Sequence, residues 1–516
     1  MIKKIAIHCD LSNSSGLGHL SRMKNLSIEL EKKGSKCYFL FYQQNKKYVT
    51  KHTKMLKVIF FSNKNKFKSI KDILLKNNFS ILILDSYENN FLLEKTLVKH
   101  GHFVVSIDDH LRKYHSNIVV TNRIPENNLF TIKQNQIWLS GTKYILAIKK
   151  AKRINKFKNK PKRLKLLLHA GGSSSYNYIK NFTLATLDAI DKYNLDASII
   201  CTSSYAKNYI KKLSIKYSKT SKLKILPFIK DLSKKIKNYD LVAGPMGTTT
   251  FEAIMSGIFP FSVPIKDDGR DSVNSWHTLG HLAHLTNIEK KNTIIIKDMW
   301  SLIITNYEDL LNLLIKNSKQ LDGLGPKRLA EKIIFYFKNS EKRIDNIDVK
   351  KKNDLVYSEK CKISDIRYFF NARNKKKTEG VSILKRRLTW PEHISWWLRS
   401  DIKKYKLLSV GHTIGYYWIK INKDKEGKFI TSDYFFSKDM PDKIQLAHKI
   451  LRIQLKIIKK IYKNSTWIIV TKKTNKFLEI LYKKFGFYPA SKNSMFRALN
   501  KPFKKNRDTR VIEMII

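Results

Sequence analysis

Cysteine is scarce in this chain and widely scattered. The 516 residues contain only four cysteines, Cys9, Cys37, Cys201 and Cys361. This pattern excludes a disulfide-dense scaffold and the closely spaced ligand pairs of a structural zinc site. It fits a protein that folds in a reducing compartment, so we expect a cytoplasmic location and no bound metal.

Long apolar runs are missing as well. No stretch approaches the ~20 apolar residues that a membrane-spanning helix needs. The apolar run at the N-terminus is short and ends at Asp10, so it is not a signal peptide. The sequence therefore predicts no membrane span, while a hydrophobic fraction of 42% is sufficient for buried cores.

Acidic residues are few compared with basic ones. Asp and Glu number 42 against 101 Lys and Arg, which gives a formal net charge of +59. Lys outnumbers Arg by 84 to 17 and is spread along the whole chain. Proteins that read nucleic acids rely on Arg for bidentate contacts, whereas scattered Lys indicates a compositional bias. A basic nucleic-acid binder is therefore the weaker alternative, although such a surface still attracts anions such as nucleotides.

Short apolar runs alternate with helical periods in the first 120 residues and again after residue 163. Continuous apolar strands that alternate with helices predict parallel sheets covered on both faces. In the first segment we predict a helix over 20–33 and strands over 5–7, 37–41, 81–85 and 103–108. In the second segment we predict strands over 164–169, 197–201, 223–226 and 240–244.

The predicted fold class is α/β throughout, as two doubly wound parallel-sheet domains followed by a further α/β domain. The predicted boundaries are 1–155 and 156–338 for the two domains, 339–358 for a charged linker, 359–505 for the third domain and 506–516 for a tail. The third domain is predicted to contain helices over 363–371, 390–398, 443–462 and 475–485, and strands over 407–412, 413–421, 428–436 and 467–470.

The first predicted strand runs into a turn that contains Gly16 and Gly18, and a helix begins beside His19. Glycines let the backbone approach a ligand closely, and a helix N-terminus attracts an anion. In open α/β sheets, ligands bind at this carboxyl end of the strands. The helix dipole favours a neutral imidazole at His19, which can take a proton from water. A capping loop whose histidine only packs is the alternative.

Six short motifs follow one another over roughly residues 1–290: Gly16-Leu17-Gly18-His19-Leu20-Ser21-Arg22, Asp85-Ser86-Tyr87, Ile107-Asp108-Asp109, Gly141-Thr142-Lys143-Tyr144, Gly171-Gly172-Ser173, and Gly247-Thr248-Thr249-Thr250-Phe251-Glu252 with Gly257 and Pro260. In this order they resemble the UDP-sugar hydrolase of pseudaminic acid synthesis, a relative of the GT-B glycosyltransferases. One departure concerns an Asn-Gln pair that the family carries after the Glu-bearing helix, because 267–275 contains no Gln. The identity of the sugar therefore stays open.

The resemblance implies a GT-B-like pair of domains and a reaction. A histidine, here His19, activates a water that attacks the anomeric carbon of a UDP-linked diacetamido trideoxy sugar and expels UDP. The substrate and nucleotide contacts it implies are Gly16, Gly18, Arg22, Asp85, Tyr87, Gly171, Gly172, Ser173, Gly247, Thr248, Thr249 and Glu252. Three of these, Gly171 to Ser173, are expected to meet the diphosphate, and Glu252 the ribose hydroxyls. The alternatives are a strand-end cap for Asp85 and Tyr87 and a surface charge for Glu252.

The third domain has its own motifs: Asn371-Ala372-Arg373-Asn374, Trp390 to Trp397, and Asn475 to Phe487 with Tyr482 and Gly486. They resemble the GNAT N-acetyltransferases that act on amino sugars. The resemblance implies acetyl-CoA as co-substrate, contacts to it from Asn475 and Ala447, and protonation of the departing CoA thiolate by Tyr482. Trp390, Trp396 and Trp397 are predicted to form core and pocket wall.

The GNAT-like pyrophosphate loop departs from the family pattern. Asp442 stands where Arg or Gln is usual, and Gln445 stands where Gly is usual. A carboxylate repels a pyrophosphate, and a side chain in place of Gly restricts the approach of the backbone. A degenerate module without acetyl transfer is therefore the alternative for this domain.

The combined hypothesis is a bifunctional enzyme whose substrate is a UDP-amino sugar and which does not bind nucleic acid. The third domain would acetylate the 4-amino group of the sugar, and the first two domains would then hydrolyse UDP from the product. A GT-B glycosyltransferase that passes the sugar to an acceptor remains the alternative. The stereochemistry of the sugar and the oligomeric state stay open.

Overall fold

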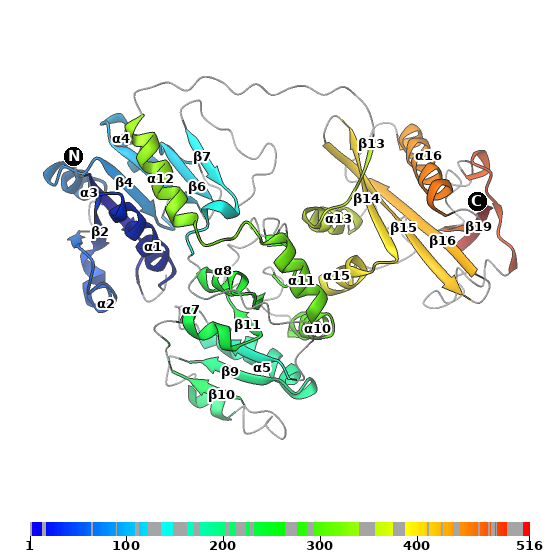
Figure 1. Ribbon diagram of the computed structural model, residues 1–516, viewed down its shortest axis with the longest axis horizontal. Coiled ribbons are helices and arrows are strands. Elements are labelled where there is room, and N and C mark those ends of the chain that lie inside the picture. The colour runs from blue at the N-terminus through cyan, green and yellow to red at the C-terminus, as the bar shows by residue number, and fades with distance from the viewer. Residues whose placement is uncertain are drawn as a thin grey trace. The chain divides into compact units, whose positions relative to one another are not determined.

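Three sheets organise the chain in the computed structural model (Figure 1). Two of them belong to unit 1, Met1–Asp345, and one belongs to unit 2, Asn346–Ile516. None of the helices that the structure describes is both long and apolar enough to cross a bilayer. The described residues are 3–12, 17–62, 66–88, 90–108, 113–121, 136–147, 163–169, 176–201, 207–212, 223–227, 229, 232–263, 276–277, 279–285, 293–339, 357–374, 387–409, 412–424, 427–436, 443–462, 465–472, 475, 480, 482–492 and 509–516.

The first domain is a seven-stranded parallel sheet with strand order β3-β2-β1-β4-β5-β6-β7. Alternate residues of β1 enter opposite cores, Ile5 and Ile7 on the side of α1 and Ala6 on the other side. The strands are β1 (Lys4–Cys9), β2 (Lys36–Tyr42), β3 (Val58–Phe61), β4 (Ile81–Asp85), β5 (Phe103–Asp108), β6 (Ile118–Thr121) and β7 (Ile137–Ser140). The helices are α1 (Gly18–Lys32), α2 (Lys46–His52), α3 (Lys66–Lys76) and α4 (Phe91–Lys99). The predicted parallel sheet is thus confirmed, while β3, β6 and β7 were missed because four-residue strands carry little periodicity.

The second domain is a five-stranded parallel sheet with order β10-β9-β8-β11-β12. Its strands are β8 (Lys165–Leu168), β9 (Asp196–Ile200), β10 (Lys224–Leu226), β11 (Leu241–Gly244) and β12 (Phe259–Ser262). Its helices are α5 (Tyr176–Lys192), α7 (Leu232–Lys235), α8 (Thr248–Met255), α10 (Thr293–Thr305) and α11 (Tyr307–Asn317). Four of these five strands, β8 to β11, were predicted from the sequence, and most of their ends agree with the predicted ends to within about one residue.

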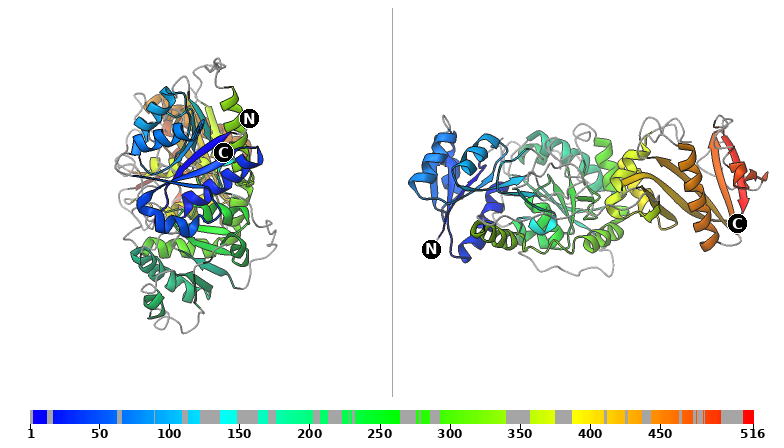
Figure 2. Two further views of the ribbon diagram at one scale, coloured as in Figure 1. Left: turned by 90° about the vertical axis from the view of Figure 1, so that its left-hand side faces the viewer. Right: turned by 90° about the horizontal axis from the view of Figure 1, so that it is seen from above.

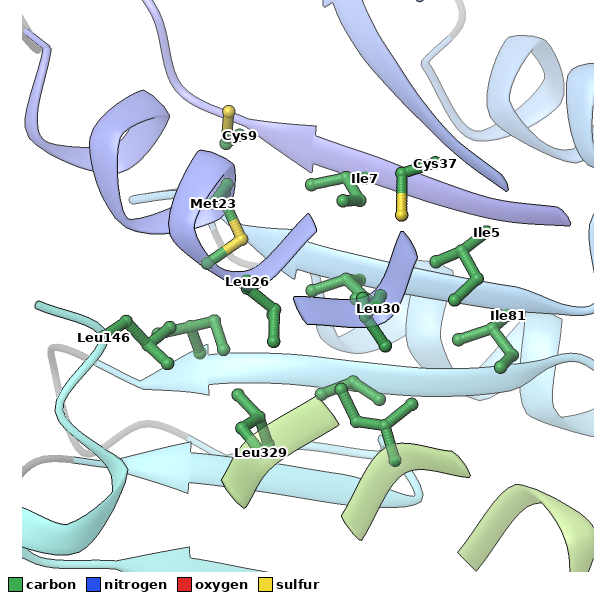
Figure 3. Packing of buried hydrophobic residues seen from close by; sticks show 14 of the residues in the cluster. Ile5, Ile7, Cys9, Met23, Leu26, Leu30, Cys37, Ile81, Leu146 and Leu329 are labelled. Atoms are coloured by element: carbon green, nitrogen blue, oxygen red, sulfur yellow. The ribbon is translucent and has the colours of Figure 1, made fainter. Parts of the chain in front are cut away.

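Helix α12 (Gly325–Lys338) follows the second domain in sequence but packs on the first. Leu329, Ala330 and Ile333 lie in the same core as Leu26 and Leu30 of α1 (Figure 3). The predicted domain boundary at 338 is therefore wrong for this helix. The physical reason is that its apolar stripe completes the first core, which sequence order does not reveal.

One of the six sequence motifs, Gly141 to Tyr144, contacts helix α12. Gly141 has a φ of +89°, which favours glycine, and the short helix Thr142–Tyr144 follows it. Tyr144 packs against the first core, and Arg328 of α12 donates a hydrogen bond of 3.4 Å from Nη1 to the Lys143 carbonyl. This motif therefore supports the return of the chain to the first domain.

At Gly325, the first residue of α12, the backbone passes too close to the backbone of Ile145 to allow a side chain. A Cβ on Gly325 would lie 2.0 Å from the carbonyl oxygen of Ile145. Because backbone must move to relieve that overlap, we expect Gly325→Ala to lower the free energy of unfolding of unit 1 by about 1–3 kcal/mol in urea denaturation. Gly18→Ala is the matched control, since both glycines begin a helix and a Cβ on Gly18 would have no atom of the described part of the chain within 4 Å. Equal losses in the two variants would contradict the tight crossing.

Unit 2 contains a seven-stranded mixed sheet with order β13-β14-β15-β16-β17-β19-β18. Helices α13 (Ile366–Arg373) and α15 (Trp390–Leu398) lie on one face and α16 (Lys443–Ile461) on the other (Figures 1 and 2). The strands are β13 (Tyr357–Lys360), β14 (Ile402–Ser409), β15 (His412–Asp424), β16 (Gly427–Phe436), β17 (Thr466–Lys472), β18 (Tyr488–Pro489) and β19 (Thr509–Ile515).

The C-terminal residues predicted as a tail belong to this sheet. Strand β19 lies between β17 and β18 and pairs with β17 along its whole length. Its residues Val511, Ile512 and Met514 are buried. The strand was not recognised in the sequence because the charged residues Arg510 and Glu513 interrupt its apolar pattern. The domain also begins earlier than predicted, because β13 starts at Tyr357. The predicted linker lies almost wholly outside the described residues, and residues 476–479 and 481 of the predicted helix over 475–485 lie outside them as well.

Candidate active site

Both parallel sheets of unit 1 have a switch point where the strand order reverses. It lies between β1 and β4 in the first domain and between β8 and β11 in the second. The connections on either side of such a point run in opposite directions, which leaves a crevice at the carboxyl ends of the strands. Four of the six motifs singled out in the sequence follow these four strands.

His19 is the second residue of α1, directly after β1, and is 4% exposed. Its Nδ1 lies 2.8 Å from Oδ1 of Asp85, the last residue of β4, which is fully buried. The two side chains therefore meet across the first switch point. The predicted catalytic histidine is paired with a carboxylate that fixes its ring.

Arg22 completes this cluster from the next turn of α1. Its Nε donates a 2.6 Å hydrogen bond to Oδ2 of Asp85, and its Nη2 donates to Oδ1. Burial alone would raise the pKa of Asp85, but the charge of Arg22 and the hydrogen bonds from His19 and Arg22 hold it well below the ordinary value.

The protonation of Asp85 determines the tautomer of His19. An ionised carboxylate can only accept hydrogen bonds, so the proton of the imidazole lies on Nδ1, toward Asp85. The lone pair is then on Nε2, where it can accept a proton from water. The nearby Nη2 of Arg22, 3.0 Å from Nδ1, is directed to the same carboxylate.

Tyr87 lies beside this pair and is 48% exposed. Its ring meets the ring of His19 edge-on, with centroids 4.5 Å apart. Its backbone N–H donates a 2.7 Å hydrogen bond to Oδ2 of Asp10, the residue that follows β1. Sequence reasoning missed the role of Asp10, although a carboxylate directly after the first strand was the available signal.

Asp85 and Arg22 were both predicted to contact the substrate. Asp85 is fully buried, so this role is wrong for it, whereas Arg22 is hydrogen-bonded to Asp85 but partly accessible, and its substrate contact stays a prediction. Their position makes them orienting groups for His19. Gly16 lies outside the described residues.

Gly18 and Gly247 share a property. Gly18 has no positive φ, the φ of 173° at Gly247 is extended backbone that any residue adopts, and a Cβ on either would have no atom of the described residues within 4 Å. Among the described residues, packing and backbone conformation therefore do not explain why these helix starts carry glycine. Close approach of a ligand to the backbone would explain it.

The predicted nucleotide segment opens helix α8. Gly247 is exposed and donates its N–H to Oγ1 of Thr250 at 3.3 Å, while Thr248 and Thr249 are half-buried in the first turn. Glu252 is half-buried one turn further along. Helices α1 and α8 contact each other, so the structure brings the two motif-bearing helices together. Gly171, Gly172 and Ser173 lie outside the described residues.

His169 lies at the second switch point and was not singled out from the sequence. It follows β8 and is buried against Gly244, at which a Cβ would lie 2.6 Å from its Nε2. Burial lowers the pKa of His169 to about 4, so the ring is neutral at pH 7. A histidine at the end of a strand, directly before the Gly-Gly-Ser motif, was the signal in the sequence.

In unit 2, Tyr482 is 5% exposed and packs on Phe487 with ring centroids 5.3 Å apart. Burial, with the charges of Tyr434 and Asp433, raises its pKa well above the ordinary value. Its hydroxyl is therefore protonated at neutral pH, as a proton donor must be.

The predicted contact of Ala447 with acetyl-CoA is not supported by its position. Ala447 is the fifth residue of α16, lies in the hydrophobic core and is 1% exposed. Only the first four backbone N–H groups of a helix lack a partner within the helix, and the N–H of Ala447 is the fifth. Asn475 is half-buried shortly after β17, and Asp442 lies outside the described residues. Trp390 is buried, and Trp396 and Trp397 pack against the core that contains Phe369 of α13, as predicted for core residues, while their place in a pocket wall stays a prediction.

Comparison with known proteins supports the fold. No protein-family model matches the chain. The structure of MurG from Acinetobacter baumannii aligns with a TM-score of 0.50 and 13% identity, covering 64% of this chain and 99% of MurG. A UDP-GlcNAc 2-epimerase from Neisseria meningitidis, solved with UDP-GlcNAc, aligns with a TM-score of 0.47 and 14% identity, covering 65% of this chain and 100% of its own. The alignment with MurG, together with the two parallel sheets, shows that the pair of domains in unit 1 is GT-B-like, as predicted.

The sequence has a relative that extends over both units. An uncharacterized protein of Methanocaldococcus jannaschii is 25% identical over 422 residues, which covers 77% of this chain and 78% of that protein. Unit 1 ends at Asp345, so a match of this extent includes parts of unit 2. The combination of the two units is thus shared with this relative.

Proposed function

We propose that unit 1 hydrolyses a UDP-linked sugar and that His19 activates the attacking water. The observation that carries the proposal is the His19–Asp85 pair, at 2.8 Å, which leaves the lone pair on Nε2. Nε2 takes a proton from water as the oxygen attacks the anomeric carbon, and UDP departs with the bonding electrons. The positive charge that develops on the imidazole is stabilised by the ionised Asp85.

The starts of α1 and α8 are suited to the UDP moiety. Each offers free backbone N–H groups and the positive end of a helix dipole, and each begins beside an unhindered glycine, Gly18 or Gly247. We assign Glu252, half-buried on α8, to the ribose hydroxyls because of the sequence resemblance. We assign Gly171 to Ser173 to the diphosphate because of the sequence resemblance.

The substrate proposed is a UDP-linked diacetamido trideoxy sugar, and the pathway is nonulosonic (pseudaminic) acid synthesis. Both follow from the six ordered motifs and the GT-B-like fold. Tyr87, half-exposed beside His19, is the side chain placed to contact the sugar.

Incubation of the purified full chain with this UDP-sugar in H₂¹⁸O tests the proposal. We expect UDP release, with the label in the anomeric hydroxyl of the free sugar. A glycoside formed on an added acceptor, with no labelled sugar, would establish the glycosyltransferase alternative. No UDP release from any UDP-amino sugar would overturn both.

Gly18→Ala separates a ligand role from a structural one. The added methyl group meets no atom of the residues that the structure describes, so we expect the free energy of unfolding to be unchanged or slightly higher. The same methyl group hinders contact between the substrate and the first backbone N–H groups of α1. We therefore expect kcat/KM for UDP release to fall by about tenfold or more, equivalent to ~1.4 kcal/mol. Steady-state kinetics and urea denaturation measure the two effects, and unchanged kinetics would remove the ligand role of this glycine.

We further propose that unit 2 transfers an acetyl group from acetyl-CoA to the 4-amino group of the UDP-sugar. The support is the strand order of its sheet together with β16 and β17, which pair in parallel at three positions and then separate. We assign the thioester to the region where these strands are no longer paired, and we assign the protonated hydroxyl of Tyr482 to the departing thiolate. Release of CoA thiol in the presence of a UDP-4-amino sugar tests this activity, and no release would leave a degenerate module.

A further inference from the structure

The loop that follows β4 is tied to a strand that is not the neighbour of β4. In the first sheet β1 lies between β4 and β2. Glu88, three residues after the end of β4, nevertheless accepts hydrogen bonds from the hydroxyl of Tyr42, the last residue of β2, at 3.1 Å on Oε1 and 2.9 Å on Oε2. The loop therefore crosses the carboxyl end of β1, the strand that leads to His19.

Lys66, the first residue of α3, holds the same carboxylate. Its ammonium group pairs with Oε2 of Glu88 and donates a 2.7 Å hydrogen bond to Oδ1 of Asn90. The side chain of Lys66 is only 11% exposed, so water competes little for the ammonium group. Burial alone would raise the pKa of Glu88, but the hydrogen bond and charge of Lys66 and the hydrogen bond from Tyr42 hold it below the ordinary value. The carboxylate is therefore ionised at pH 7.

Tyr87 lies directly before this anchored carboxylate. Its own N–H donates to Oδ2 of Asp10 at 2.7 Å, and the N–H of Glu88 donates a 3.1 Å hydrogen bond to Oγ of Ser86. The backbone is thus held on both sides of the Tyr87 Cα. The residue is half-exposed and its ring meets His19 edge-on, so packing fixes this ring less than it would fix a buried one. Its placement depends on the anchored backbone.

We infer that Glu88 is a positioning residue for the hydrolysis in unit 1 and that it acts by holding Tyr87 beside His19. This step rests on the function proposed above, in which Tyr87 contacts the sugar and His19 activates water. The carboxylate of Glu88 is bound by Tyr42 and Lys66, so its effect on the substrate passes through the neighbouring Tyr87. A contact from Tyr87 acts on the bound substrate and the transition state alike, so misplacing it raises KM and leaves kcat nearly unchanged.

Glu88→Gln in the full chain tests this role, with Glu331→Gln as the matched control. Glu331 is a carboxylate of unit 1 that also pairs with a lysine, Lys33, and its side chain is 47% exposed against 48% for Glu88. Glutamine keeps the size of Glu88 but replaces one accepting oxygen by an N–H donor, and Lys66 can only donate. We expect KM for the UDP-sugar to rise by about tenfold in Glu88→Gln, with kcat within about twofold of wild type. Glu331→Gln should keep wild-type values of both.

A double-mutant cycle shows whether Glu88 acts through Tyr87. Once the ring is removed by Tyr87→Ala, a residue that only positions the ring has nothing left to hold. We therefore expect Glu88→Gln to change kcat/KM by less than about twofold in the Tyr87→Ala background, against about tenfold in the wild-type background. Tyr42→Phe is a milder second variant, because it removes one donor to the carboxylate and leaves the ring in its core. It should raise KM in the same way by about two- to threefold.

Hydrogen exchange follows the placement of the loop directly. The amide of Tyr87, which is bonded to Asp10, should exchange about tenfold faster or more in Glu88→Gln, while the amides of α1 keep their wild-type rates. Unchanged exchange at Tyr87 would overturn the positioning role whatever the activity.

The kinetic outcomes separate this role from the function on which it rests. An unchanged KM in Glu88→Gln, or a fall in kcat alone that marks a smaller folded fraction, overturns the positioning role and leaves the hydrolysis intact. Equal losses in the wild-type and Tyr87→Ala backgrounds do the same, because Glu88 would then act independently of the ring. No UDP release by the wild type overturns the proposed hydrolysis and the role of Glu88 together.

Discussion

Replacement of His19 by glutamine is expected to lower the rate of UDP release by about 10²–10⁴-fold, the usual contribution of a positioned base. Glutamine keeps a polar group beside Asp85 but has no basic nitrogen to take the proton from water. The loss should appear in kcat and kcat/KM together, because proton transfer occurs only in the transition state. Initial rates from a coupled UDP assay measure it.

His52→Gln provides the control for the His19 variant. His52 ends α2 in the same domain, away from the switch point, and is partly exposed. We expect wild-type rates from this variant and unchanged urea midpoints from both. Undiminished UDP release by His19→Gln would remove the proposed base and with it the assignment of the site.

Asp85→Asn is expected to impair both turnover and stability. The amide can no longer hold the Nδ1 proton of His19 by a charge, so the productive tautomer is lost and turnover should fall by about 10²–10⁴-fold. The substitution also leaves Arg22 without its buried partner, and breaking such a pair costs about 3–5 kcal/mol. Urea unfolding of the two proteins measures the second effect.

The stability difference should depend on pH in a defined direction. The pKa of Asp85 is lower in the folded chain than in the unfolded chain, so its contribution is fully present above the unfolded value of about 3.9. The contribution is lost as the pH falls from there toward the folded pKa. The gap between wild type and Asp85→Asn should therefore narrow below about pH 4.

A double variant separates the two roles of Asp85. Adding Arg22→Met to Asp85→Asn removes the unpaired guanidinium, so we expect part of the lost stability to return while UDP release stays low. Wild-type turnover in Asp85→Asn, with reduced stability, would mean that Asp85 only supports the fold.

Local pattern predicted much of unit 1. The runs that became β1, β4 and β5 were recognised because strands buried on both faces are continuously apolar. The glycine turn before His19 was recognised because its meaning is local, at the junction of a strand and a helix. Asp85 was also found, but with the wrong role, because burial and partnership with Arg22 depend on residues more than 60 positions away.

Sequence patterns located β1, β2, β4 and β5 of the first sheet and four strands of the second, and they identified His19 at the start of the first helix. The tertiary structure set the strand order, which puts β4 beside β1 and so places Asp85 against His19. It also decided that α12 returns to the first domain and that residues 509–515 join a sheet. The physical reason is that a pattern of apolar residues shows which face of a helix or strand must be buried, but does not show which element it packs against. The orientation of the His19 ring depends on that packing partner.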